Sequence, residues 1–138
     1  MRPEDSEMAA IFDYIRRIDS IKDIAFHCPN EAKRTPQAGA RMKRIGMLAG
    51  VSDIFIPKAS KGFYGLFIEV KARSAAGYYG KPTKTQLDFI EKVMSEGYFG
   101  VVSYGADEAI DTIRWYLSGE PILAIARKDN EPCNKKEN

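Results

Sequence analysis

The sequence has few cysteines and almost no histidine. Its 138 residues include two cysteines, Cys28 and Cys133, which lie far apart and form no CxxC pair. This usage favours a reducing, cytoplasmic compartment over a disulfide-stabilised secreted fold. The single histidine, His27, excludes most zinc sites, and no GxSxG motif accompanies it. His27 is therefore expected to be a packed, hydrogen-bonded histidine, and Cys28 a small buried apolar residue.

Long apolar runs, repeats and low-complexity segments are also missing. Without eighteen consecutive apolar residues no transmembrane helix is expected, and no membrane partner. The N-terminus is acidic where a signal peptide would need a basic start followed by an apolar stretch. The content of 44% hydrophobic and 29% charged residues is typical of a soluble globular domain. We expect one domain over residues 1–127 and a polar, flexible tail over 128–138.

Positive charge is concentrated in the middle of the chain. Residues 22–84 contain twelve basic and four acidic side chains, a net charge of +8. Residues 1–21 have a net charge of −2, and residues 85–138 have a net charge of −4. A basic middle between acidic ends predicts a polyanionic partner such as DNA, and a solvated basic face is the alternative.

The apolar spacing predicts an α/β fold, a mixed sheet flanked by helices. Helices are expected over about 5–19, over 83–97 and from Asp107 to Gly119. The second of these opens with a capping box formed by Thr83 and Gln86. Residues 29–50 should form a long basic connection with a helical turn near 40–48. Strands are expected over 24–28, 53–57, 66–72 and 98–103, with a hairpin turn over 58–65 and room for a short strand over 121–126.

Three charged residues in this pattern point to phosphodiester chemistry. In a strand Glu69 and Lys71 project from the same face, and the hairpin can place Asp53 across from Glu69. Two neighbouring carboxylates repel each other, and a hard divalent cation such as Mg²⁺ relieves that repulsion. Bound metal activates a water and stabilises charge on phosphate, and Lys71 can assist. The alternative is a structural ion pair at a sheet edge.

Longer motifs around these residues carry a resemblance to a known family. Asp53 ends the segment GVSD (50–53), and Glu69 and Lys71 lie in the segment FIEVK (67–71). Gln86 lies at the start of a predicted helix. PNEAKR (29–34), GY (97–98) and AIDTI (109–113) follow the same order. From about Glu4 to Leu117 the chain resembles the virus-type replication-repair nucleases (VRR-NUC) of the PD-(D/E)xK superfamily. Ser52 stands where the family has proline, a residue that ligates nothing.

The resemblance implies a restriction-endonuclease-like αβββαβ core that uses Mg²⁺ or Mn²⁺. It implies metal ligation by Asp53, Glu69 and the Val70 carbonyl, Lys71 as the catalytic lysine and Gln86 as an active-site residue. The alternative for Gln86 is its capping role alone. A first-helix glutamate is also expected near the metal. We favour Glu7 over Glu4, although a first-turn acid is also favoured by the helix dipole alone.

Basic side chains are the candidates for contacts with the DNA backbone, because such contacts need only positive charge. The predicted set comprises Lys33, Arg34, Arg41, Lys43, Arg44, Arg73, Lys81 and Lys84. Tyr78 and Tyr79, in the glycine-flanked loop 73–82, can stack on a DNA strand or simply lie in solvent.

These features predict a metal-dependent DNA endonuclease. The resemblance implies action on branched DNA in the manner of Holliday-junction resolvases. It also implies a homodimer, because symmetric cutting of two strands requires two active sites. The expected setting is the cytoplasm of a bacterium, with the gene carried by the bacterium or a phage. The rivals are a non-catalytic DNA-binding module, in which the Asp/Glu/Lys cluster is structural, and a protein-interaction domain with an acidic partner.

Overall fold

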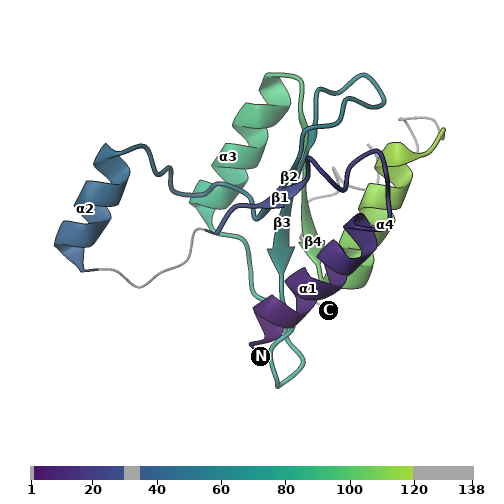
Figure 1. Ribbon diagram of the computed structural model, residues 1–138. Helices are drawn as coiled ribbons and strands as arrows, with labels where there is room; N and C mark the ends of the chain where they lie inside the picture. Colours follow the sequence, from purple (N-terminus) through teal and green to yellow (C-terminus); the bar gives the residue numbers. More distant parts are fainter. Residues whose placement is uncertain (1, 30–34, 120–138) are drawn as a thin grey trace.

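The computed structural model describes residues 2–29 and 35–119, and a mixed sheet forms its centre (Figure 1). The strand order is β1-β2-β3-β4. Strands β1, β2 and β3 are antiparallel neighbours, and β4 is parallel to β3. The nearly continuous apolar sequence of the strand over 66–71 agrees with its central position in the sheet. The strands span Phe26–His27 (β1), Ile54–Ile56 (β2), Leu66–Lys71 (β3) and Phe99–Tyr104 (β4).

Helices cover both faces of the sheet. Helices α1 and α4 lie side by side on one face, and α3 covers the other (Figure 1). Helix α2 stands away from the body of the domain. The order α1-β1-β2-β3-α3-β4 is the predicted αβββαβ core, with α2 inserted between β1 and β2, and it confirms the restriction-endonuclease-like fold. The helices span Pro3–Ile15 (α1), Pro36–Arg44 (α2), Lys84–Ser95 (α3) and Ala106–Leu117 (α4).

Alternation along β3 decides which side chains enter the core. Leu66 and Ile68 are fully buried in the main core, together with Ile11 and Ile15 of α1. Phe67 points to the other face, where its ring meets Phe89 of α3 edge-on at 5.3 Å. Because side chains alternate, Glu69 and Lys71 lie on the same face as Phe67, toward α3.

Two helix boundaries differ from the predictions. Helix α1 ends at Ile15, not near residue 19, because the chain continues in tight turns. In one of these turns the Ile18 N–H donates a hydrogen bond to the Ile15 carbonyl at 3.0 Å. Helix α2 begins at Pro36, earlier than the predicted turn at 40–48. The Thr35 side chain accepts a hydrogen bond from the Ala38 N–H at 3.1 Å and caps it. Threonine at the cap followed by proline at the first helical position is a local start signal.

The start of α4 also corrects the sequence analysis. The sequence predicts a helix that starts with Asp107 as its capping acid, but Gly105 occupies the cap position with φ +88°, a conformation that favours glycine. The carboxylate of Glu7, from α1, accepts the hydrogen bond of the Ala106 N–H instead. The predicted strand 121–126 and tail 128–138 lie outside the described residues. No helix in the described part is long and apolar enough to cross a membrane.

Candidate active site

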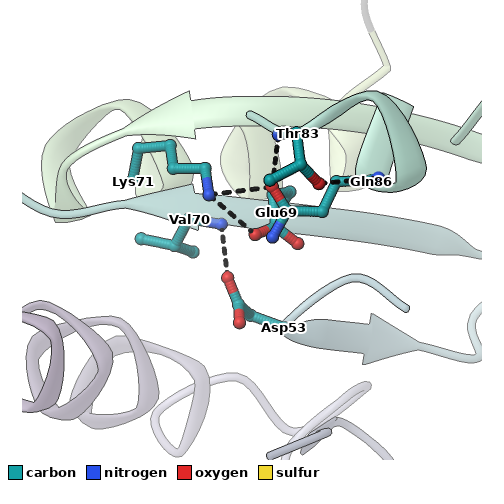
Figure 2. A network of polar contacts seen from close by, with 6 residues as sticks. All are labelled: Asp53, Glu69, Val70, Lys71, Thr83 and Gln86. Atoms are coloured by element: carbon teal, nitrogen blue, oxygen red, sulfur yellow. Dashed lines mark hydrogen bonds and ion pairs between the residues drawn. The ribbon is translucent and has the colours of Figure 1, made fainter. Parts of the chain in front are cut away.

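Asp53 lies at the open end of β2 and is fixed by two neighbouring strands (Figure 2). Its main-chain carbonyl accepts hydrogen bonds from the Cys28 N–H and from Nδ1 of His27, each at 2.7 Å. Its carboxylate oxygen Oδ2 accepts from the Val70 N–H at 2.8 Å. Both the backbone and the side chain of Asp53 are thus held in place, which is what a ligating carboxylate needs.

Glu69 is a buried carboxyl group beside Asp53. The register Ile54↔Ile68 places Asp53 and Glu69 across from each other, and only 3% of Glu69 is exposed. Its oxygen Oε1 lies 3.4 Å from Nζ of Lys71, whereas Oε2 has no hydrogen-bond partner in the described part of the chain. Burial, and then the charge of Asp53, raises the pKa of Glu69 to about 7 against the opposing effect of Lys71. A buried, unsatisfied carboxylate oxygen beside a second carboxylate is an arrangement that a cation would stabilise.

Lys71 and Gln86 connect this pair to the start of α3. Nζ of Lys71 donates to Oε1 of Gln86 at 2.9 Å, and the same oxygen accepts from the Thr83 N–H at 2.9 Å. The Gln86 N–H in turn donates to Oγ1 of Thr83, which completes the capping box (Figure 2). The two roles considered for Gln86 are therefore compatible, because the oxygen that caps the helix also orients Lys71.

The donor set fits a hydrated hard cation. A cavity of about 50 Å³ adjoins Asp53 and Val70 and has room for a few waters, although Glu69 does not line it. Within residues 2–29 and 35–119 no three His, Cys, Asp or Glu side chains gather into a ready metal centre. Two carboxylates, a backbone carbonyl and waters are nevertheless a set that Mg²⁺ accepts. The residues that line the cavity are Glu4, Asp5, Met8, His27, Asp53, Val70 and Ala72.

The acidic residues of α1 divide between two places. Glu7 directs its carboxylate to the N-terminus of α4, where it binds the Ala106 N–H. Glu4 and Asp5 line the cavity beside Asp53, and Asp5 forms an ion pair with Arg2 at 3.1 Å. Of the two glutamates considered, Glu4 is therefore the one that lines this cavity. Asp5 was not among the predicted site residues, although its position three residues before Met8 places it on the Met8 side of α1.

The neighbours of Asp53 are structural rather than reactive. His27 is hydrogen-bonded to the Asp53 carbonyl, as expected of a packed histidine. Cys28 is only partly buried, and burial together with the charge of Asp53 raises the pKa of its thiol, which disfavours the nucleophilic thiolate. Ser52 is fully buried, and its hydroxyl has no partner within the described residues. The hydroxyl that stands at the family's proline position therefore makes no hydrogen bond that proline would forfeit.

The basic candidates fall into two separate groups. Arg41, Lys43 and Arg44 are exposed on α2, which stands apart from the loop after β3 (Figure 1). Arg73, Lys81 and Lys84 belong to that loop and the start of α3. The Arg73 side chain donates to the Gly77 carbonyl at 3.0 Å, and Nζ of Lys84 lies 3.7 Å from Asp88. Lys33 and Arg34 lie outside the described residues.

A second cavity, larger than the one beside Asp53, lies away from the carboxylates. It measures about 440 Å³ between α2 and α3 and is lined by residues such as Met42, Leu48 and Phe89. Among the described residues that line it, Asp88 is the one acid, so this part of the chain offers it no pair of carboxylates for a cation. We therefore place the candidate active site by its chemistry, at Asp53, Glu69 and Lys71.

Comparisons with known proteins agree with the fold described above. No protein-family model matches the chain, and no curated protein matches it. A solved structure described as a "VRR_NUC domain protein" is similar, with a TM-score of 0.71 and 28% sequence identity. The match covers 85% of this chain and 89% of that one. The resemblance to VRR-NUC domains that the motifs indicated is thereby confirmed.

Proposed function

From the similarity to a VRR_NUC domain protein, we propose that this chain is a metal-dependent DNA endonuclease. The observation that carries the proposal is the meeting of Asp53, Glu69 and Lys71 at the ends of β2 and β3. Glu69 is buried with an unsatisfied oxygen beside Asp53, and Lys71 lies 3.4 Å from its other oxygen. Two carboxylates this close repel each other when both are ionised, and a bound cation would relieve that repulsion.

Each residue of the site has a distinct role in the proposed hydrolysis. Asp53, Glu69 and the Val70 carbonyl would hold Mg²⁺ or Mn²⁺. When bound, the cation would lower the pKa of a coordinated water and stabilise charge on a phosphate oxygen. Lys71 carries a positive charge that can orient the attacking water or neutralise the negative charge that develops on the phosphate. Gln86 keeps the Lys71 ammonium on the side of the carboxylates through its 2.9 Å hydrogen bond.

The proposed substrate is branched DNA, bound by a homodimer. The exposed basic side chains of α2 support contact with a DNA arm, because phosphate contacts need charge rather than a shaped pocket. Symmetric cutting of two strands requires two active sites, and one domain of this kind supplies one. A dimer with twofold symmetry would place two such sites on one junction.

A cleavage panel tests the proposed function. The purified protein is incubated with single-stranded, duplex, flap, splayed-arm and four-way-junction DNA, each with Mg²⁺, Mn²⁺ or EDTA. We expect metal-dependent cleavage at internal positions of the DNA strands, strongest on a branched substrate, and no cleavage in EDTA. Binding without cleavage under all metal conditions would instead identify a DNA-binding module. Gel filtration with light scattering reports the dimer independently.

A further inference from the structure

The loop between β3 and α3, residues 73–82, lies directly beside the candidate active site. It begins two residues after Lys71 and ends just before the capping box of α3 (Figure 1). A Cβ placed on Gly80 would lie 3.8 Å from Cδ of Lys71, so the loop backbone passes over the side chain of the candidate catalytic lysine. From Lys71 to Leu87 the chain has four basic residues and no acidic one, a charge that suits DNA.

Hydrogen bonds close this loop tightly around its tip. The Ser74 N–H donates to the Tyr78 carbonyl at 2.8 Å, and the Tyr78 N–H donates to Oγ of Ser74 at 3.2 Å. The Arg73 side chain binds the Gly77 carbonyl at 3.0 Å, and Arg73 and Tyr79 form an isolated β-bridge. The tip therefore has a defined conformation rather than the variable one of an open solvent loop.

The two tyrosines at this tip have opposite environments. Tyr79 packs edge-on against Tyr104 at the end of β4, with ring centres 5.7 Å apart, and so fastens the loop to the sheet. Tyr78 is 77% exposed, and its ring has no aromatic partner within the described residues. A large aromatic ring held out in solvent on an anchored backbone loses little further conformational entropy when it binds a flat partner.

We propose that Tyr78 is a stacking platform for an unpaired nucleobase within a few nucleotides of the phosphate that is cleaved. The proposal rests on the proposed endonuclease function and adds a determinant of substrate choice. Tyr78 lies two residues from Gly80, so their Cα atoms are at most about 7 Å apart. Since a DNA strand advances about 3.4 Å per nucleotide, the base that stacks on Tyr78 lies within a few nucleotides of the site at Lys71.

Stacking explains a preference for unpaired over duplex DNA. Bases inside a duplex already stack on each other, and an external ring cannot reach their faces. At a flap, gap or junction an unpaired base exposes its face, and an aromatic side chain can cover it whatever its sequence. Tyr78 would thus select branched or gapped substrates without reading bases.

The test compares binding of two DNA duplexes that differ at one nucleotide. Both duplexes carry the fluorescent base 2-aminopurine. This base is paired in one duplex, and it is unpaired beside a gap in the other. Binding is measured in EDTA so that no cleavage occurs. For the wild type we expect tighter binding of the gapped DNA and a change in 2-aminopurine fluorescence. In Tyr78→Ala the affinity ratio of gapped to paired DNA should fall by about 5-fold to 150-fold. Tyr78→Phe should keep both signals.

Tyr64→Ala is the matched control. Tyr64 is 67% exposed but lies before the start of β3, about 17 Å of strand away from Lys71. This variant should retain the wild-type ratio. Wild-type DNA binding with an unchanged ratio and fluorescence response in Tyr78→Ala would overturn the stacking role alone. Absence of DNA binding by the wild type would overturn the proposed function and the stacking role with it.

Discussion

At the scale of single residues, Glu69 is a carboxyl group whose surroundings oppose its ionisation. Its pKa rises to about 7 in the folded protein, from the ordinary value of 4.5. The folded protein therefore binds more protons than the unfolded chain between about pH 4.5 and pH 7. The free energy of unfolding must then fall as the pH rises through this window, because ionisation is penalised only in the folded state.

This linkage predicts the pH dependence of stability without metal. In EDTA the wild type should lose on the order of 3 kcal/mol relative to Glu69→Gln between pH 4.5 and pH 8. The two proteins should have similar stability at the acidic end, where Glu69 is neutral. Urea unfolding across this range measures the difference, and contributions from groups common to both proteins cancel. A difference that stays constant with pH would refute the assignment.

Asp53→Asn reports on the same pair from the other side. The amide oxygen of the new side chain can still accept the Val70 hydrogen bond, but the charge that helps to raise the pKa of Glu69 is removed. This variant should melt at or above the wild-type temperature in EDTA at pH 8 and gain less from Mn²⁺. Wild type should gain about 2.7 kcal/mol at a hundred times its Kd. A clearly lower melting temperature, with no Mn²⁺ effect on wild type, would indicate a structural pair.

The sequence could predict Asp53 and Glu69 as neighbours because two local features decide their placement. Strand alternation sets the face of Glu69, and the hairpin pairing of β2 with β3 sets its register against Asp53. Which of Glu4 and Glu7 lies near the site could not be predicted from such local features. Both lie on α1, and the packing of α1 against α4, in which Glu7 meets a residue 99 positions later in the chain, directs Glu7 away from the cavity.

At the scale of elements, the start of α3 joins helix stability to the site. Thr83→Ala and Gln86→Ala each remove part of the capping box and should each cost about 1 kcal/mol. Only Gln86→Ala also removes the acceptor of the Lys71 ammonium. We therefore expect Gln86→Ala to reduce cleavage at least 10-fold more than Thr83→Ala at equal stability. Equal cleavage rates of the two variants would leave Gln86 with its capping role alone.

Helix α2 gives a prediction about affinity rather than chemistry. If Arg41, Lys43 and Arg44 bind phosphates, removing each of these side chains should lower the slope of log K against log salt by about 0.9 in magnitude. The triple alanine variant tests this on duplex arms, and Arg17→Ala, an exposed arginine of the acidic N-terminal part, is the control. An unchanged slope in the triple variant would remove α2 from the DNA interface.

The sequence predicted elements best where the signals are local. The capping box of α3 spans four residues and was predicted correctly. The start of α2 has an equally local signal, a capping threonine (Thr35) followed by proline (Pro36), but the predicted helical turn began later in the chain. The cap of α4 depends on Gly105 and on a carboxylate from the other end of the chain, so the nearby acid Asp107 gave a misleading signal.

At the scale of the whole molecule, the topology brings the site together from three segments. The ends of β2 and β3 supply the carboxylates and the lysine, the start of α3 orients the lysine, and the loop 73–82 passes above it. The mixed sheet was predictable because a hairpin connection makes two strands antiparallel and a crossover helix makes the next pair parallel. The position of α2 was not, since this helix makes few contacts with the rest of the fold.

Single substitutions at Asp53, Glu69 and Lys71 test the central claim most directly. DNA cleavage with Mg²⁺ and DNA binding in EDTA are measured for the wild type, Asp53→Asn, Glu69→Gln and Lys71→Ala. We expect each variant to fold and to bind DNA with nearly wild-type affinity but no longer to cut it, because the basic residues on α2 and in the loop provide the affinity. Cleavage at the wild-type rate by any of the three variants would contradict the assignment of that residue to the active site.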